Sequence, residues 1–394
     1  MKIAWFHSHL LNTNSGGTRF VIDYASGLSE QYGHQVTLYC DIASSEAIKL
    51  LTQSGVKVVE LDNKSTNSPI YWLTLPIRIL QKRKELHPDI LAYDVLFSSM
   101  FPMNWLIANF DIPQIQMCYE PFAFFYDHIF LQNFKVHQRI FFKIMKWFYQ
   151  STDRASTRKS DRLLTVNKTN IPKIQSEYGI HPNVVYAGID TLLYHRAEPS
   201  EIEAIRKNYQ GYPLLFHSTD LTGIKGTFPL LEITRRLVEK FPELKLLITV
   251  YVNDLDGIKK LQQRIAELEL DRNVKYIGCL DKTKLPLYYS AVDFVCQPSI
   301  NQPANWPLKE ALLCGTPIIG GAESEETLDF VNGIKIDLRN RQESHEKLEA
   351  LFASNLAFSI DNTQLLADYS FKGCLDKFNR IIKDTANEYK IRKT

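Results

Sequence analysis

The stretch Gln297-Pro298-Ser299 through Pro317-Ile318-Ile319-Gly320 decides the fold, because a strand, a loop, a short helix and a second strand follow one another in it. Inside it lies Gln302-Pro303-Ala304-Asn305-Trp306-Pro307-Leu308-Lys309-Glu310-Ala311, closed by Cys314-Gly315-Thr316-Pro317. A loop that feeds a helix N-terminus offers unpaired backbone N–H groups and a positive dipole end, which suit a phosphate. Glu310 follows as a carboxylate that only accepts hydrogen bonds, which suits the vicinal hydroxyls of a ribose. Together these features predict a pocket for a sugar nucleotide.

Strand-like and helix-like segments alternate outward from this stretch, which predicts parallel sheets covered by helices. In the first half we expect strands at 3–6, 36–39, 56–61, 95–98, 115–118 and 163–166. In the second half we expect strands at 214–217, 244–250, 274–277, 294–297 and 317–319, and a helix over 228–238. The joint between the halves is predicted near Gly188-Ile189-Asp190.

The bulk properties describe an ordinary globular chain. Its 394 residues favour two or three domains, and 45% apolar and 23% charged residues are typical of soluble proteins. The net charge of +2 gives no argument for a nucleic-acid partner. Six isolated cysteines without a Cys-x-x-Cys pair predict buried thiols in a reducing compartment. No apolar run approaches the roughly 20 residues that span a bilayer, so we expect a cytoplasmic protein, soluble or peripheral at the inner face of the membrane.

The deciding stretch resembles the motif of the retaining glycosyltransferases of family 4, which adopt the GT-B fold. That family carries Glu-x7-Glu here, followed by Cys-Gly-Thr-Pro. The chain keeps Pro307, Glu310, Ala311 and the 314–317 tail, but has Gln302 in place of the first glutamate. The segments 184–190, 273–278 and 288–293 resemble further landmarks of the family, so the resemblance covers essentially the full chain.

The resemblance implies an α/β protein of the GT-B type, with two Rossmann-like domains whose parallel sheets face across a cleft. Residues 1–190 would bind the acceptor, residues 191–370 would bind the nucleotide sugar, and a helix at 371–394 would cross back to the first domain. The implied function is retaining transfer of a sugar from a nucleotide-sugar donor to a glycan or glycolipid acceptor, in polysaccharide or glycoconjugate biosynthesis.

Lys225 is the predicted partner of the departing diphosphate. Gly223-Ile224-Lys225-Gly226 follows the first strand of the second half, and the family has a phosphate-binding lysine before a glycine here. The alternative is a solvated surface lysine. The family usually also has an arginine five residues earlier, where this chain has Asp220. An acid there would repel a pyrophosphate unless it points away, so the neutralising charge is smaller or comes from another residue.

Two further loops carry candidate residues. Asn14-Ser15-Gly16-Gly17-Thr18 follows the first strand, and its glycines would let backbone N–H groups approach a diphosphate; a plain turn is the alternative. Glu120 stands where many family members have a histidine beside the donor sugar. Its carboxylate would stabilise oxocarbenium character or accept the acceptor's proton, and a purely structural role is equally open.

The resulting site prediction has two overlapping sets. The catalytic set is Glu120, Lys225, Gln302 and Glu310, and the donor-binding set is Gly16, Gly17, Thr18, Lys225, Gly278, Ala304, Asn305, Trp306 and Glu310. No cofactor and no metal are expected. Asp254-Leu255-Asp256 has the Asp-x-Asp form of some metal-binding transferases, but it lies in a polar turn before a helix, where aspartates commonly cap the helix or simply face water.

A basic, aromatic segment over 134–162 suggests an anionic membrane surface as a partner. Its positive residues, which recur at helical spacing, are Lys135, Arg139, Lys143 and Lys146. Its aromatic residues are Phe141, Phe142, Trp147 and Phe148. The alternative is an amphipathic helix that buries its aromatic residues in the first domain. The segment 71–84 repeats the combination more weakly.

Two other functions stay open at this point. Gln302 and Asp220 are compatible with a catalytically weak GT-B subunit that binds a sugar nucleotide and supports an active partner. A sugar-nucleotide epimerase would need its own acid/base set, which the sequence does not show.

Overall fold

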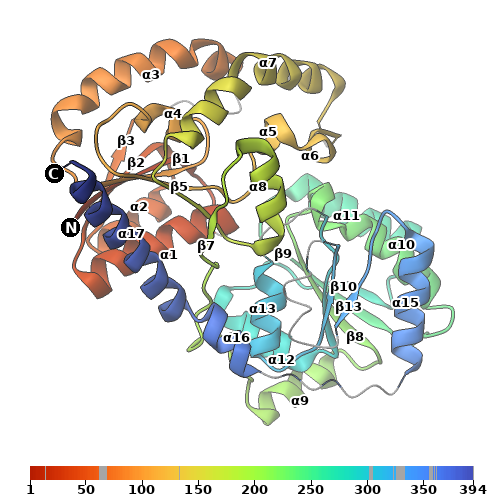
Figure 1. Cartoon of the computed structure of the whole chain (residues 1–394). Helices are drawn as coiled ribbons and strands as arrows, with labels where there is room; N and C mark the ends of the chain where they lie inside the picture. The colour runs from red at the N-terminus through yellow and green to blue at the C-terminus, as the bar shows by residue number, and fades with distance from the viewer. Residues whose placement is uncertain are drawn as a thin grey trace. The chain divides into compact units, whose positions relative to one another are not determined.

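The computed structural model describes residues 1–13, 15–61, 69–132, 134–300, 305–322, 324, 333–354, 358, 360 and 362–393. The chain divides into two compact units. Unit 1 is Met1–Ala187 together with Lys372–Thr394, and unit 2 is Gly188–Phe371. Each unit is built on an open parallel sheet with helices packed against it (Figure 1).

The described part of unit 1 holds a seven-stranded parallel sheet in the order β3-β2-β1-β4-β5-β6-β7. Its strands are β1 (Lys2–Leu10), β2 (Gln35–Ala43), β3 (Lys57–Glu60), β4 (Val95–Ser99), β5 (Gln114–Met117), β6 (Arg162–Thr165) and β7 (Asn183–Val184). Its helices before the second unit are α1 (Gly16–Tyr32), α2 (Ser45–Gln53), α3 (Pro69–Ile90), α4 (Met103–Ile107), α5 (Ala123–Tyr126), α6 (His128–Gln132), α7 (Val136–Arg158), the 3-10 helix η1 (Lys168–Asn170) and α8 (Ile171–Tyr178).

The alternation of side chains along the central strands gives unit 1 an apolar layer on each face of its sheet. Ala4, Phe6 and Leu96 point to one face and join an apolar cluster with residues of α3, α4 and α7. Trp5 and Phe97 point to the other face, with ring centroids 4.4 Å apart. There they pack against α1 and against the last helix, α17 (Phe371–Lys393).

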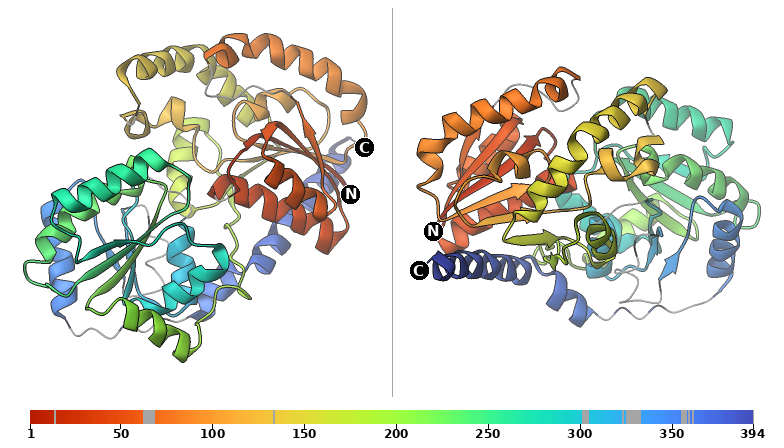
Figure 2. Two further views of the ribbon diagram at one scale, coloured as in Figure 1. Left: turned by 180° about the vertical axis from the view of Figure 1, so that it is seen from behind. Right: turned by 45° about the horizontal axis from the view of Figure 1, so that its top comes forward.

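α17 completes unit 1 although it follows unit 2 in the sequence. Phe378 lies at its centre, is fully buried, and has its ring centroid 5.2 Å from Phe97, 5.3 Å from Tyr24, 5.8 Å from Trp5 and 6.3 Å from Phe20. The views in Figures 1 and 2 show α17 running along unit 1. The predicted return of the C-terminal helix to the first domain is confirmed.

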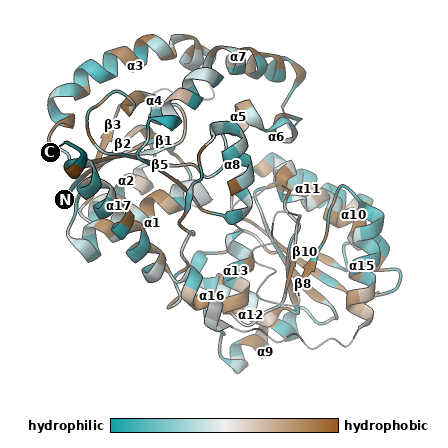
Figure 3. Cartoon of the chain, viewed as in Figure 1, coloured by the Kyte–Doolittle hydropathy of each residue, from teal (hydrophilic) through white to brown (hydrophobic). Residues whose placement is uncertain are grey.

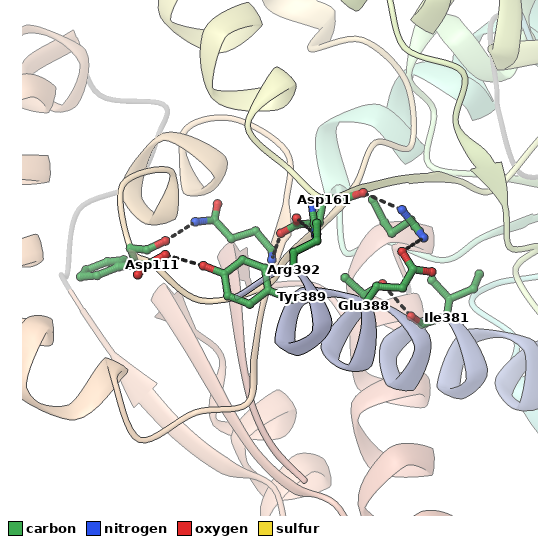
Figure 4. Close-up of polar contacts among 10 residues, drawn as sticks. Asp111, Asp161, Ile381, Glu388, Tyr389 and Arg392 are labelled. Atoms are coloured by element: carbon green, nitrogen blue, oxygen red, sulfur yellow. Dashed lines mark hydrogen bonds and ion pairs between the residues drawn. The ribbon is translucent and has the colours of Figure 1, made fainter. Parts of the chain in front are cut away.

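Polar contacts fix the far end of α17 to the loops of unit 1 (Figure 4). Tyr389 Oη donates to Asp111 at 2.5 Å, and the Arg392 guanidinium lies 2.5 Å from the carboxylate of Asp161. Glu388 forms an ion pair with Arg162. These contacts limit how far the helix can shift if its apolar face is altered.

The described part of unit 2 holds a six-stranded parallel sheet in the order β10-β9-β8-β11-β12-β13. Its strands are β8 (Leu214–Thr219), β9 (Lys245–Val250), β10 (Val274–Tyr276), β11 (Phe294–Gln297), β12 (Ile318–Gly320) and β13 (Ile334–Lys335). Its helices are α9 (Pro199–Asn208), η2 (Gly223–Lys225), α10 (Thr227–Leu237), α11 (Leu255–Glu267), η3 (Lys282–Lys284), α12 (Leu285–Ala291), α13 (Trp306–Leu313), α15 (Arg341–Ala353) and α16 (Asn362–Tyr369).

The two parallel-sheet units confirm the predicted α/β fold class. Each predicted strand overlaps an observed one, whereas β7 and β13 were not predicted because each has only two residues. Cys279 is exposed, and the other five cysteines are buried. Among the described residues, no helix combines the length and apolar character that a bilayer span needs.

Candidate functional site

The carboxyl edge of the unit 2 sheet gathers those predicted donor-binding residues that lie in the described part of unit 2. Ligands of open α/β sheets bind outside the carboxyl ends of the strands. Lys225 follows β8, Glu310 lies on the helix that follows β11, and these two strands pair in the sheet. Gly278 follows β10 at the same edge. Gln302 and Ala304 lie outside the described residues, so the structure neither supports nor contradicts their predicted roles.

Lys225 is a buried lysine, so the alternative of a solvated surface residue is wrong. Only 8% of the residue is exposed, and Nζ lies 5.6 Å from the centroid of the Tyr251 ring. Burial lowers the pKa of the ammonium group, and the nearby charge of Asp220 acts in the opposite direction. An ammonium group held in a low-dielectric site interacts more strongly with an anion than one in water.

The turn that carries Lys225 is fixed at both ends. Thr227 Oγ1, at the start of α10, lies 2.7 Å from Thr219 Oγ1 and 3.0 Å from Nε2 of the buried His217. The Ile300 N–H donates to the Ile224 carbonyl at 2.8 Å, which ties this turn to the loop that follows β11. The position of Lys225 is therefore set by the framework of unit 2.

Gly226 is required where it stands. Its φ of +71° lies in the left-handed region, and a Cβ there would lie 2.1 Å from Leu338 Cδ1 and 3.1 Å from the Pro298 carbonyl oxygen. The glycine after Lys225 therefore serves close packing within unit 2, whatever it contributes to ligand binding.

The carboxylate of Asp220 accepts hydrogen bonds from neighbouring groups of unit 2. Its Oδ1 accepts from the backbone N–H of Thr222 at 3.0 Å and from the Thr222 hydroxyl at 2.6 Å, and its Oδ2 accepts from Tyr251 Oη at 3.0 Å. These three donors offset the negative charge that the sequence places near Lys225. The sequence-based prediction did not include Tyr251. Its position directly after β9, at the carboxyl edge of the sheet, could have pointed to it.

Glu310 is buried on α13, with 2% of the residue exposed. Its Oε2 accepts from Tyr289 Oη at 3.2 Å, and burial, reinforced by the charge of Glu310, raises the pKa of this tyrosine. Asn305 and Trp306 at the start of the helix are also buried, and Asn305 Nδ2 donates to Ser324 Oγ at 3.0 Å. Contact of these residues with a ribose or a sugar stays a prediction.

The glycine pair of unit 1 begins α1. Gly16 is the first residue of that helix, and Ser15 Oγ donates to the hydroxyl of the buried Thr18 at 2.9 Å. Among the described residues, and apart from the adjoining backbone, a Cβ on Gly17 would meet no atom within 4 Å. The predicted diphosphate contact of Gly16, Gly17 and Thr18 stays a prediction, and Asn14 lies outside the described residues.

Glu120 lies at the carboxyl edge of the unit 1 sheet, between β5 and α5. It is half-buried, and its backbone carbonyl accepts from Cys118 Sγ at 3.2 Å. Its catalytic and its structural role both stay predictions.

Unit 1 also contains a buried carboxylate that the sequence did not reveal. Asp153 on α7 is 1% exposed and accepts from Asn104 Nδ2 at 3.1 Å, Tyr126 Oη at 3.0 Å and Tyr178 Oη at 2.9 Å. Burial raises its pKa to about 6, although these hydrogen bonds favour the ionised form. Asp153 thereby joins α4, α5, α7 and α8.

The first aspartate of the Asp-x-Asp sequence caps a helix, which is one of its two predicted roles. Asp254 is the N-cap of α11, and its Oδ1 accepts from the Gly257 N–H at 2.9 Å. Within the described residues, no group of three or more His, Cys, Asp and Glu side chains could hold a metal ion. Metal-independent chemistry stays a prediction.

The basic segment forms the helix α7. Two of its aromatic residues pack within unit 1, and two are exposed. Phe141 and Phe142 are partly buried, with the Phe142 ring 4.4 Å from that of Phe124, which favours the alternative of packing within unit 1 for these two residues. Trp147 and Phe148 are instead 78% and 56% exposed. Lys135 and Lys143 are exposed, Lys146 is partly buried, and Arg139 donates to the carbonyl groups of Gln132 and Phe134 at 2.6 Å.

Family models match both units of the chain. Residues 14–192 match the model described as Glycosyltransferase Family 4, and residues 200–361 match the model described as Glycosyl transferases group 1.

Curated relatives match about half of the chain at low identity. The D-inositol 3-phosphate glycosyltransferase of Salinispora arenicola is 26% identical over 197 residues, which are 45% of this chain and 44% of that protein. The MMP alpha-(1->4)-mannosyltransferase of Mycolicibacterium hassiacum is 26% identical over 181 residues, 45% of this chain and 41% of that protein. The matched segment thus spans less than half the length of each relative.

The fold as a whole is similar to that of solved glycosyltransferases. The crystal structure of Anabaena HepE in complex with UDP and glucose has a TM-score of 0.70 and 16% sequence identity, and covers 98% of this chain and 100% of that one. At this identity the likeness shows the GT-B arrangement of elements, and the ligand belongs to HepE.

Proposed function

Because the chain is a family 4-like protein of the GT-B group 1 glycosyltransferases, we propose that it transfers a sugar from a nucleotide-sugar donor to a glycan or glycolipid acceptor. We further propose that the transfer retains the anomeric configuration and needs no metal. The observation that carries the proposal is Lys225, a buried ammonium group on a rigid turn at the carboxyl edge of the unit 2 sheet.

Lys225 would stabilise the departing diphosphate. Negative charge develops on the leaving group as the glycosidic bond breaks, and a fixed ammonium group in a dry site stabilises that charge without reorganisation. The N–H groups at the start of α13 would add further donors with the favourable end of the helix dipole. Glu310 on the same helix would accept from the ribose hydroxyls, giving up its bond from Tyr289 or sharing the carboxylate with it.

The site chemistry supports a nucleotide-sugar donor, and experiment must identify the nucleotide base of that donor. HepE, a structural neighbour, was solved with UDP, which makes UDP the first nucleotide to test. A thermal-shift panel of UDP, GDP and ADP and their sugar conjugates, followed by mass detection of transferred or hydrolysed sugar, identifies the donor.

Two variants test the site assignment with little change to the folded protein. Lys225→Met keeps the volume of the side chain and removes its charge, and Glu310→Gln keeps an acceptor for Tyr289. Each should weaken binding of the best nucleotide roughly 10- to 100-fold, since a hydrogen bond to a charged group contributes about 1.5–3 kcal/mol. Lys259→Met, on the exposed side of α11, is the matched control.

The outcomes separate the proposal from its main rival. Unchanged nucleotide affinity in both variants would contradict the site. Binding that depends on Lys225 and Glu310, without turnover of any donor, would instead favour a catalytically weak binding subunit, which the neutral Gln302 makes chemically reasonable. Transfer of a sugar to an acceptor with retained configuration would support the full proposal.

A further inference from the structure

The outer sides of α3 and α7 expose an unusual number of large apolar side chains. Nine of the seventeen exposed large apolar residues in the described chain lie on these two helices. They are Ile70, Leu73, Ile77 and Leu80 on α3, and Val136, Ile140, Ile144, Trp147 and Phe148 on α7. We call this set the apolar face.

Both helices turn this face away from the sheet of unit 1. Their inner sides pack into one apolar cluster, to which α3 contributes Leu75 and Ile79 and α7 contributes Met145 and Tyr149. Tyr149 Oη also donates to the Trp72 carbonyl at 2.6 Å, which joins the two helices directly. Figures 1 and 2 show α3 and α7 along the same border of unit 1, and Figure 3 shows apolar and polar residues alternating along both.

The charge that accompanies the apolar face is positive. α7 contains five Lys and Arg residues, and its single acidic residue, Asp153, is buried on the inner side. Lys135, which precedes α7, and Lys143 are exposed, as is Lys84 one turn beyond Leu80 on α3. Glu85 and Asp89 of α3 are exposed as well, so the excess of positive charge is concentrated on α7.

We propose that the apolar face, with its flanking lysines, binds the surface of a bilayer that contains anionic lipids. Apolar side chains on one side of a helix insert at the headgroup boundary, and nearby Lys and Arg residues are attracted to anionic headgroups. Trp147 is suited to such an interface because its indole is apolar with one polar N–H. A second copy of this chain would bring the same positive charge against the apolar face, which disfavours self-association as the alternative.

The test uses the full chain and vesicles of defined composition. Sedimentation with vesicles of equal parts phosphatidylcholine and phosphatidylglycerol should bind the protein, and vesicles of phosphatidylcholine alone should bind it far less. The variant Lys84→Gln/Lys135→Gln/Lys143→Gln should lose about 100-fold in partition coefficient, since each lysine near an anionic surface contributes about fivefold, the equivalent of about 1 kcal/mol.

A second variant separates insertion from simple charge attraction. Leu73→Gln/Ile77→Gln/Trp147→Gln leaves the charge unchanged and should also abolish sedimentation with the anionic vesicles. Because all three residues are more than half exposed, its thermal unfolding should match that of the unaltered protein. The matched control Leu255→Gln/Lys259→Gln/Lys260→Gln changes exposed residues of unit 2 and should bind as the unaltered protein does.

Each other outcome overturns the proposal. No binding to anionic vesicles, equal binding to neutral ones, or equal loss in the control would show that the apolar face is not a membrane site. A concentration-dependent dimer that the apolar variant abolishes, without vesicle binding, would assign the face to self-association. Sedimentation needs no donor or acceptor, so its result is independent of the proposed transfer.

Discussion

Replacing Phe378 by alanine should destabilise unit 1 more than any change on the exposed side of α17. The side chain is fully buried, and its ring lies among the rings of Trp5, Tyr24 and Phe97. It is the largest contribution of α17 to this layer of unit 1, so its removal leaves a cavity between the helix and the sheet.

The size of the effect follows from how far that cavity can close. Truncating a buried Phe to Ala usually costs about 3–5 kcal/mol, and the cost is higher where the surroundings cannot collapse. The contacts of Tyr389 and Arg392 with Asp111 and Asp161 hold the far end of α17 in place. We therefore expect the free energy of unfolding to fall by about 4 kcal/mol. It should not reach the upper end of the range, because α17 lies at the surface and can close part of the cavity.

Urea unfolding followed by tryptophan fluorescence measures this loss, because four of the five tryptophans lie in unit 1. With a slope of about 2.5 kcal/mol/M, the midpoint should fall by about 1.6 M. Lys377→Ala, at the neighbouring exposed position, should change it by less than about 0.2 M, since exposed substitutions usually stay within about 0.5 kcal/mol. Equal midpoints for Phe378→Ala and Lys377→Ala would refute the assigned packing of α17.

Three further predictions concern single residues. Burial raises the pKa of Asp153 to about 6, so its contribution to the stability of unit 1 is greatest below about pH 4. This contribution falls by up to about 3 kcal/mol as the pH rises through 6, and Asp153→Asn should remove the corresponding fall in the urea midpoint. Burial lowers the pKa of His217 to about 4, so unit 2 loses up to about 3 kcal/mol as the pH falls from about 6.5 to 4, and His217→Gln should flatten that loss. Gly226→Ala should lower the stability of unit 2 by about 1–3 kcal/mol in calorimetry, because the added Cβ combines a left-handed φ with a clash against Leu338.

The expected signs of the two pH effects are opposite, which makes them separable. A pH profile of unit 1 that is the same with and without Asp153→Asn would show that this carboxyl titrates normally when folded. An unchanged acid profile for His217→Gln would show the same for the imidazole. A Gly226→Ala protein as stable as the original would mean that the loop after β8 can move away from Leu338.

The fold could be predicted from the sequence because each central strand is a short apolar run bounded by polar or glycine residues. Phe294–Gln297 was predicted with its observed bounds, and the helix predicted over 228–238 is α10. The two-residue strands β7 and β13 were not predictable, since two residues carry no periodic signal. Their pairing depends on neighbours that are distant in the sequence.

The candidate site could be predicted from the sequence only where one residue type at one position would carry the chemistry. Lys225 before Gly226 is such a case. The orientation of Asp220 toward Thr222 and Tyr251 could not be predicted, because it depends on a tyrosine that follows a different strand. The same limit applies to α7, where helical spacing gives the angle of a residue around the axis but not which neighbours cover it.

The place of α17 in unit 1 has a consequence for synthesis of the chain on the ribosome. Domains generally fold as units in the order in which they emerge. Here Trp5, Phe20 and Phe97 emerge long before Phe378, which covers them, and all of unit 2 is made in between. The aromatic layer of unit 1 therefore cannot be completed until α17 has been made, after all of unit 2.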